Sequence, residues 1–322
     1  MGRKILITGA AGFIGQFLAR ELLQDPSNTL ILTDAVAFSP PKGAQNPQNA
    51  TAIQADLLED LSMVHPDLDA VFILHGIMSA GSEANFELGL RVNLDATRKL
   101  LVKISETCPG IKVVYASAGA VYGQPLPDVI NENVVPTPQS SYGSQKLMCE
   151  MLINDLSRRG MIDGVSLRLP SISVRPGKPT AAASSFISGI IREPIAGVEC
   201  IVPLKDRSFP SWVCSPKTLM QNLIHALDLP GEFLPRHKRT IIAPGVVVTI
   251  QDMLDALATV AGPQTLQYVK EVDDPELGRI LCSWAWNYDC RLAIGLGFEE
   301  DAGFEQAVRD YVVYLEEEKA WV

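Results

Sequence analysis

The stretch Lys4-Ile-Leu-Ile-Thr-Gly-Ala-Ala-Gly-Phe-Ile-Gly15 decides the fold of this chain. It predicts a short apolar strand, a turn rich in glycine, and the start of a helix whose apolar residues recur at helical spacing. Gly9, Gly12 and Gly15 leave no side chain between the backbone and a ligand, and a helix N-terminus favours anions. The stretch therefore indicates a turn that binds the pyrophosphate of a dinucleotide. The alternative is a turn whose glycines serve only helix–strand packing.

A second apolar strand, Thr29-Leu-Ile-Leu-Thr-Asp34, ends on an acid about twenty residues beyond the glycine turn. Dinucleotide-binding folds place a carboxylate here to bind the ribose hydroxyls. Because a 2′-phosphate would be repelled by Asp34, and no arginine occurs in residues 35–39, we expect NAD as the cofactor. The alternative for Asp34 is a helix cap or a turn acid.

Strands and helices alternate through the first half of the chain. Strands are expected at residues 51–55, 70–75, 111–117 and 164–169, with a long helix at 85–107. This order predicts an α/β fold, a Rossmann doubly wound parallel sheet. Residues 1–170 are expected to form the NAD-binding domain, with a possible returning strand near 239–243. Residues 171–322, which are richer in proline, are expected to supply a smaller C-terminal cap that binds substrate.

Composition narrows the function further. The net charge of −10 argues against nucleic acid or an anionic membrane as a partner. No apolar run reaches membrane-spanning length, and the N-terminus leads directly into a strand, so we expect a cytoplasmic protein. The six cysteines and four histidines show no ligand spacing, so no metal site is expected.

Tyr142 and Lys146 stand four residues apart in Ser-Ser-Tyr-Gly-Ser-Gln-Lys146, which places both on one face of a helix. A nearby ammonium favours the phenolate form and so makes a tyrosine usable as an acid or base. Such a pair also occurs by chance on solvated helices. The predicted dinucleotide site makes the catalytic interpretation the better one.

Taken together, these motifs resemble the extended short-chain dehydrogenase/reductase family, the NAD-dependent epimerases and dehydratases. The resemblance also rests on Ala55-Asp-Leu57, Leu74-His-Gly76, Arg91-Val-Asn93, Val121-Tyr-Gly123 and Arg168-Leu-Pro170. Within the family, Arg91-Val-Asn-Leu-Asp-Ala-Thr97 and Asn154-Asp-Leu-Ser-Arg-Arg-Gly160 look most like the D-erythronate dehydrogenase group. That resemblance implies an oxidoreductase that transfers hydride from a small hydroxy acid or sugar acid to NAD.

The resemblance also implies roles for individual residues. Tyr142 would accept the proton, and Lys146 would hold the nicotinamide ribose and bias Tyr142 toward phenolate. The implied cofactor-binding residues are Gly9, Gly12, Phe13, Ile14, Gly15, Asp34, Asp56, Leu57, Leu74, His75, Gly76, Asn93, Tyr142, Lys146 and Pro170. Relatives form a dimer through the long helix after Asn85 and the Tyr142 helix, so a homodimer is expected.

One position departs from the family pattern. A Ser or Thr normally stands four residues before the tyrosine of the Val-Tyr-Gly motif, where it hydrogen-bonds the substrate oxygen, and here that residue is Ala118. Ser117 could replace it only if the strand twists or bulges, because neighbouring side chains on a strand face opposite ways. A structural serine at 117 is the alternative.

Most substrate contacts are expected from the segment that follows Pro170. Arg175 could hold a carboxylate with two hydrogen bonds, helped by Lys178, Ser184, Ser185 and Arg192. Ser79 could bind a substrate hydroxyl. Solvated loop charges and helix caps are the alternatives for these residues. Two other functions stay open, namely an epimerase or non-redox isomerase or lyase with bound NAD, and an NAD-sensing binding protein.

Overall fold

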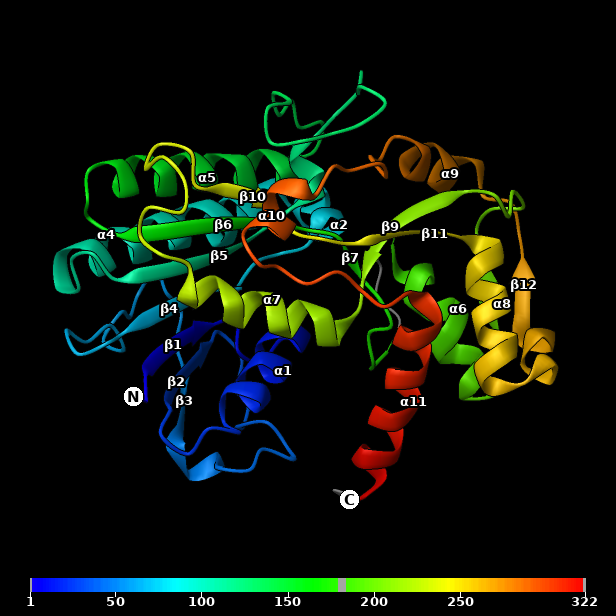
Figure 1. Cartoon of the computed structure of the whole chain (residues 1–322), viewed down its shortest axis with the longest axis horizontal. Helices are drawn as coiled ribbons and strands as arrows, with labels where there is room; N and C mark the ends of the chain where they lie inside the picture. Colours follow the sequence, from blue (N-terminus) through cyan, green and yellow to red (C-terminus); the bar gives the residue numbers. More distant parts are fainter. Residues whose placement is uncertain (1, 179–183, 321–322) are drawn as a thin grey trace.

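A seven-stranded parallel sheet forms the centre of the computed structural model, which describes residues 2–178 and 184–320 (Figure 1). The strand order is β10-β6-β5-β4-β1-β2-β3. The strands are β1 (Lys4–Thr8), β2 (Thr29–Asp34), β3 (Ala50–Gln54), β4 (Ala70–Ile73), β5 (Lys112–Ala118), β6 (Asp163–Leu169) and β10 (Thr240–Ile242). The order reverses between β1 and β4, which is where open α/β sheets bind ligands. The α/β Rossmann prediction is confirmed.

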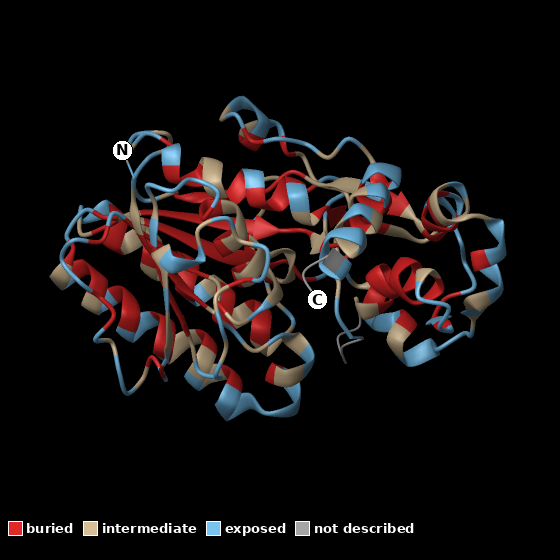
Figure 2. Cartoon of the chain, turned by 90° about the horizontal axis from the view of Figure 1, so that it is seen from below, coloured by how far each residue is buried: buried red, intermediate tan, exposed pale blue. Residues whose placement is uncertain are grey.

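Helices cover both faces of this sheet because successive strand residues alternate between two apolar cores. Ile5 and Ile7 pack into one core, on the side of α1 (Phe13–Leu22) and α7 (Pro216–Asp228). Leu6 packs into the other core, under α4 (Thr97–Thr107) and α5 (Ser141–Arg158). In Figure 2 the inner strands are buried along most of their length, whereas the edge strand β3 is only partly buried. The sheet is therefore dry on both sides, as parallel sheets generally are.

The helix expected at residues 85–107 is divided in the structure. It consists of α3 (Phe86–Gly89), the π-helical segment η2 (Leu90–Ala96) and α4, and it follows the short helix α2 (Ser79–Ala84). Asn85 caps α3 by accepting a hydrogen bond from Leu88 N at 3.0 Å. The apolar period of the sequence does not reveal a widened turn, because the inward-facing residues remain apolar on either side of it.

The remaining chain builds two small sheets and their helices, on the right of Figure 1. The three-stranded sheet contains β7 (Ser171–Ile172), β9 (Pro210–Cys214) and β11 (Val246–Thr249), and β8 (Cys200–Val202) pairs with β12 (Val269–Glu271). The helices here are α6 (Ser185–Ile195), α8 (Ile250–Ala261), α9 (Pro275–Cys282) and α11 (Phe304–Ala320). Helix α10 (Arg291–Gly295) packs against β10 near the centre of Figure 1. Short 3-10 turns are η1 (Pro47–Asn49), η3 (Gly119–Val121) and η4 (Pro263–Tyr268).

Besides α10, two further elements beyond residue 170 belong to the central sheet layer. Strand β10 pairs in parallel with β6, with Thr240 opposite Ser166, and α7 packs against α1. Within residues 2–178 and 184–320, no helix has the length and apolar character needed to cross a bilayer. The same part of the chain contains no cluster of His, Cys, Asp or Glu side chains suited to a metal ion.

Candidate active site

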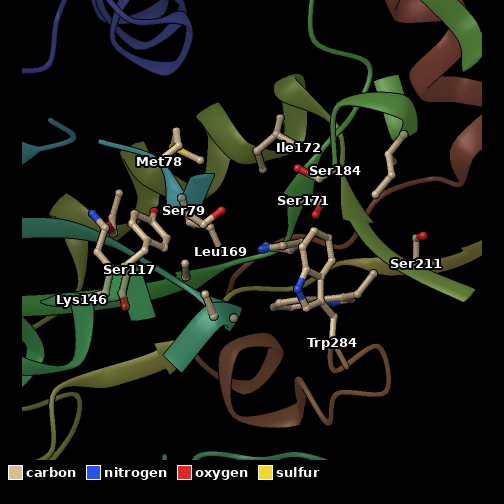
Figure 3. Close-up of a pocket in the computed structure, with 18 of the residues that line it drawn as sticks. Met78, Ser79, Ser117, Lys146, Leu169, Ser171, Ile172, Ser184, Ser211 and Trp284 are labelled. Carbon is tan, nitrogen blue, oxygen red and sulfur yellow. The ribbon is translucent and has the colours of Figure 1, made fainter. Parts of the chain in front are cut away.

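A cavity of about 450 Å³ lies between the carboxyl ends of the central strands and the C-terminal part of the chain. Figure 3 shows Lys146 and Ser117 in one part of the view, and Ser211 and Trp284 in another. The expected site residues that line the cavity are Gly9, Gly12, Phe13, Ile14, Gly15, Leu74, Gly76, Ser79, Ser117, Tyr142, Lys146, Pro170 and Arg175. Those that do not line it are Asp34, Asp56, Leu57, His75, Asn93, Lys178, Ser185 and Arg192.

The glycine turn is shaped for close backbone approach. Gly9 has φ +70°, and a Cβ there would stand 2.6 Å from the backbone nitrogen of His75. A Cβ at Gly15 would stand 2.5 Å from the carbonyl oxygen of Gly9. Gly12 is the N-cap of α1 and no side chain caps this helix, so its first amides face the cavity as hydrogen-bond donors. Such a helix end accommodates an anionic group, and the turn therefore fits the pyrophosphate of NAD.

Asp34 lies beside this turn, although it does not line the cavity. Its Oδ2 accepts a hydrogen bond from Ala11 N at 3.0 Å, and its Oδ1 accepts one from Val36 N at 3.3 Å. The carboxylate is half-buried at the end of β2. These two bonds fix a negative charge next to the turn, where it would repel a 2′-phosphate.

Asp56 and Leu57 follow β3 at the same edge of the sheet. Asp56 accepts a hydrogen bond from Leu58 N at 2.9 Å and pairs with Arg91 at 3.2 Å, while Leu57 is buried. His75 lies deeper, where its Nδ1 is 2.8 Å from Thr8 Oγ1 and its Nε2 is 3.0 Å from Thr97 Oγ1. Burial, with a smaller effect of the Lys146 charge, lowers the pKa of His75 to about 3. The imidazole is therefore neutral.

Asn93 supports the backbone near the cavity from the π-helical segment. Its Oδ1 accepts from Ile77 N at 2.7 Å, and its Nδ2 donates to Ile77 O at 3.0 Å. Nδ2 also donates to Gln145 Oε1 at 2.7 Å. A Cβ at Gly76 would meet Asn93 Oδ1 at 3.0 Å, so the loop after β4 is held tightly against this amide.

Tyr142 and Lys146 lie on the first two turns of α5 and face the cavity. Ser140 caps the helix by accepting a hydrogen bond from Gly143 N at 3.1 Å. Both side chains are buried, and Lys146 Nζ is 5.5 Å from the centre of the Tyr142 ring. Lys146 Nζ donates a hydrogen bond to Ala116 O at 2.8 Å, which fixes the ammonium at the end of β5.

Burial dominates the ionisation of this pair. It raises the pKa of Tyr142 to about 12 and lowers the pKa of Lys146 to about 8, although Cys149 and Glu150 partly oppose the second shift. The sequence suggested that Lys146 would favour the phenolate form. In the structure, burial of the phenol shifts its pKa in the opposite direction, so the phenol of the free protein keeps its proton at neutral pH.

Ser117 belongs to a buried network next to the cavity. Its Oγ donates a hydrogen bond to Glu150 Oε1 at 2.5 Å, and Glu150 also receives two bonds from Arg168, at 3.0 and 2.6 Å. Arg168 in turn donates to the Tyr122 hydroxyl at 2.5 Å. Strand β5 pairs with β6 without interruption through Ser117 and Ala118, so the bulge that Ser117 would need is absent. The Ser117 hydroxyl is therefore already engaged by a carboxylate.

Arg175 lines the cavity with a half-buried side chain. Among the described residues, no hydrogen bond or ion pair involves its guanidinium, whereas its backbone is held at both ends. Arg175 N donates to Ser188 Oγ at 3.1 Å, and Arg175 O accepts from Arg192 Nη1 at 3.0 Å. Burial and then the charge of Arg192 lower the pKa of Arg175. Arg192 itself is paired with Glu193 at 2.6 Å, and Lys178 is exposed.

Sequence reasoning missed the aromatic wall of the cavity. Trp212 on β9 stacks on Tyr288 with ring centres 3.8 Å apart, and Trp284 and Trp286 stand nearby in the chain after α9. It also missed Ser171 and Ser211, which line the cavity together with Ser184, a residue that the sequence does indicate. These residues come from segments far apart in sequence, and no spacing rule could have grouped them.

The arrangement of a glycine turn, a strand-end acid and a buried Tyr–Lys pair defines an NAD-dependent enzyme of the extended short-chain dehydrogenase/reductase type. The chain belongs to the NAD-dependent epimerase/dehydratase family, whose model matches residues 5–206. It is 40% identical to D-erythronate dehydrogenase of Cupriavidus necator in an alignment of 321 positions that covers 96% of this chain and 97% of that protein. It is 38% identical to D-erythronate dehydrogenase of Haemophilus influenzae over 97% of this chain and 99% of that protein.

Among solved structures, the chain resembles a nucleoside-diphosphate-sugar epimerase from Agrobacterium tumefaciens. The two share 34% identity with a TM-score of 0.88, over 100% of this chain and 96% of the other. The predicted membership of the extended family and the predicted enzyme class are confirmed.

Proposed function

We propose that this protein is an NAD-dependent dehydrogenase that oxidises a secondary hydroxyl of a small hydroxy acid or sugar acid similar to D-erythronate. The observation that carries the proposal is that one cavity joins the glycine turn, the Tyr142–Lys146 pair and the Arg175 guanidinium. A dinucleotide site alone fits many reactions. The guanidinium of Arg175 has no ion-pair partner among the described residues, and this favours a substrate that carries a carboxylate.

The chemistry follows from what oxidation of an alcohol requires. The hydroxyl proton must leave as the adjacent carbon loses a hydride, since loss of hydride alone would leave a high-energy cation. NAD, when bound, supplies the hydride acceptor. Tyr142 accepts the proton in its phenolate form, which the ammonium of Lys146 and the positive charge of oxidised nicotinamide would favour once NAD is bound. Lys146 also holds the ribose. Gly9 to Gly15 hold the pyrophosphate, and Asp34 holds the adenine-side ribose.

Arg175 binds the carboxylate of the substrate. A guanidinium matches a carboxylate with two parallel hydrogen bonds, and its partial burial strengthens them. Arg192 and Glu193 position Arg175 through its carbonyl oxygen. Ser79 and Ser184 are available for the other hydroxyls of a polyol acid. In this proposal, residues 171–322 mainly supply the substrate side of the cavity.

The test compares Arg175→Ala with Lys178→Ala as the matched control, since Lys178 is a nearby cation outside the cavity. Formation of NADH is measured with D-erythronate, related hydroxy acids and neutral polyols. Loss of a hydrogen bond to a charged group is worth about 1.5–3 kcal/mol, so Arg175→Ala should raise KM for acids about 10- to 100-fold. Neutral polyols should be unaffected. Equal effects on acids and neutral polyols would contradict the role of Arg175.

A second candidate is an epimerase or non-redox isomerase or lyase that keeps NAD bound. It is favoured by Ala118, which removes the usual hydroxyl partner of Tyr142. In that case, substrate would be consumed while no NADH accumulates. An NAD-sensing binding protein is the remaining alternative, and Tyr142→Phe would then leave its biological effect unchanged.

A further inference from the structure

Tyr288 is held firmly at the wall of the cavity by its backbone and its ring. Its neighbours on either side bond to Ile130, with Ile130 N donating to Asn287 O at 2.9 Å and Asp289 N donating to Ile130 O at 2.8 Å. The ring stacks on Trp212 with an interplanar angle of 25°. A residue fixed in both ways presents its hydroxyl in one place, as a catalytic group must.

The Tyr288 hydroxyl stands beside the position that has lost the family's serine or threonine. A Cβ built on Gly119 would lie 2.9 Å from the Tyr288 hydroxyl, and Gly119 directly follows Ala118. Ala118, Gly119 and Tyr288 all line the cavity. Only a residue without a side chain allows the phenol to come so close to the end of β5. Ala118, which stands where the family has Ser or Thr, is therefore adjacent in the chain to the residue that the Tyr288 hydroxyl approaches, and all three residues line one cavity.

No hydrogen bond to the Tyr288 hydroxyl is found among the described residues, in contrast to the hydroxyls of Ser117 and Tyr122. Burial, with a smaller effect of Tyr122, raises the pKa of Tyr288. The phenol therefore keeps its proton across the physiological range and has it available for a ligand. Tyr288 is half-buried and lines the cavity, where a ligand can accept a hydrogen bond from its hydroxyl.

We propose that the Tyr288 hydroxyl donates a hydrogen bond to the reacting oxygen of the substrate, in the role that a serine or threonine at position 118 fills elsewhere in the family. This inference rests on the proposed dehydrogenase function. In the oxidation, the hydroxyl proton of the substrate passes to the Tyr142 phenolate and the hydride passes to NAD. Tyr288 keeps its own proton and stabilises the charge that grows on the oxygen.

The experiment compares Tyr288→Phe with Tyr288→Phe/Ala118→Ser in steady-state oxidation of the best acid substrate. Removing one donor to a developing oxyanion lowers kcat by about 100-fold or more, so Tyr288→Phe should lower kcat strongly. KM should change less than about threefold, because the bond strengthens mainly in the transition state. The double variant should have a kcat at least tenfold higher than that of Tyr288→Phe, because Ala118→Ser returns a hydroxyl to the usual position.

Two measurements separate this role from a structural one. Phenylalanine keeps the stacked ring, and the hydroxyl has no partner among the described residues to lose, so the thermal midpoint of Tyr288→Phe should match that of the wild type. Tyr311→Phe is the control, since it removes a buried tyrosine hydroxyl on α11 away from the cavity and should leave kcat unchanged.

The outcomes distinguish the two proposals. If the wild type oxidises acids and Tyr288→Phe keeps its kcat, the role of Tyr288 is overturned while the proposed function stands. If Tyr288→Phe loses kcat and Ala118→Ser restores none of it, the role is also overturned. If the wild type forms no NADH with any acid, the proposed function fails, and the role of Tyr288 fails with it.

Discussion

Ser117→Ala should weaken the fold without slowing the reaction. The Ser117 hydroxyl donates at 2.5 Å to the carboxylate of Glu150, and both side chains are buried. A hydrogen bond to a charged group contributes about 1.5–3 kcal/mol. Because Glu150 keeps both bonds from Arg168, its charge remains paired after the substitution. The free energy of unfolding should therefore decrease by about 1.5–2 kcal/mol, the lower end of this range.

Thermal unfolding and steady-state oxidation of D-erythronate test this expectation on the same preparations. A loss of 1 kcal/mol shifts the midpoint by about 2–4 °C in chains of about 150–250 residues, so a drop of a few degrees is expected here. Values of kcat and KM should stay within about twofold of the wild type. Ser157→Ala is the matched control, since its buried hydroxyl accepts from Gly164 N outside the cavity.

The opposite result, a slower reaction with unchanged stability, would contradict a structural role for Ser117. A fall in kcat of tenfold or more, with an unchanged midpoint, would mean that the hydroxyl contacts the substrate. Ser117 would then be the replacement for the residue missing at 118.

Three further predictions concern the cofactor, the catalytic pair and the assembly. Asp34→Ala should raise KM for NAD about tenfold and reduce the preference over NADP, since the charge beside the turn is removed; an unchanged preference would contradict the role of Asp34. The pKa of Lys146 is lowered to about 8, so the folded chain binds this proton more weakly than the unfolded chain, and stability rises with pH up to the usual value near 10.5. Lys146→Met should therefore abolish turnover yet raise the thermal midpoint near neutral pH, with the gain vanishing above about pH 10.5; a lowered midpoint near neutral pH would contradict this. Met151 is 51% exposed on α5, and Met151→Glu should convert the expected homodimer to a monomer in sedimentation, whereas a wild type that is already monomeric would contradict the interface.

The parts of the fold that follow local rules could be predicted from the sequence. The glycine turn, the strand that ends at Asp34 and the helix that carries Tyr142 and Lys146 each depend on neighbouring residues and on a fixed period. The π-helical segment around Asn93 could not be predicted, because one widened turn leaves the apolar pattern nearly unchanged.

The candidate site could likewise be predicted only where it depends on residues close together in the sequence. The position of Tyr142 and Lys146 was foreseen, whereas the pKa shift of Tyr142 was not, because burial depends on residues packed from several elements. The Ser117–Glu150–Arg168 network joins β5, α5 and β6, and the contact of Trp212 with Tyr288 joins β9 to the chain after α9. Such long-range contacts leave no periodic signal.

The aromatic wall gives the protein an optical property. Three of its four tryptophans, Trp212, Trp284 and Trp286, line the cavity, so most of its indole groups lie within the proposed active site. Indole emission overlaps the absorption of reduced nicotinamide, and energy transfer falls steeply with distance. Titration with NADH should therefore quench the emission and sensitise nicotinamide fluorescence. Unlabelled protein could thus report occupancy of its own site in real time, even in variants such as Tyr142→Phe that have no turnover to measure.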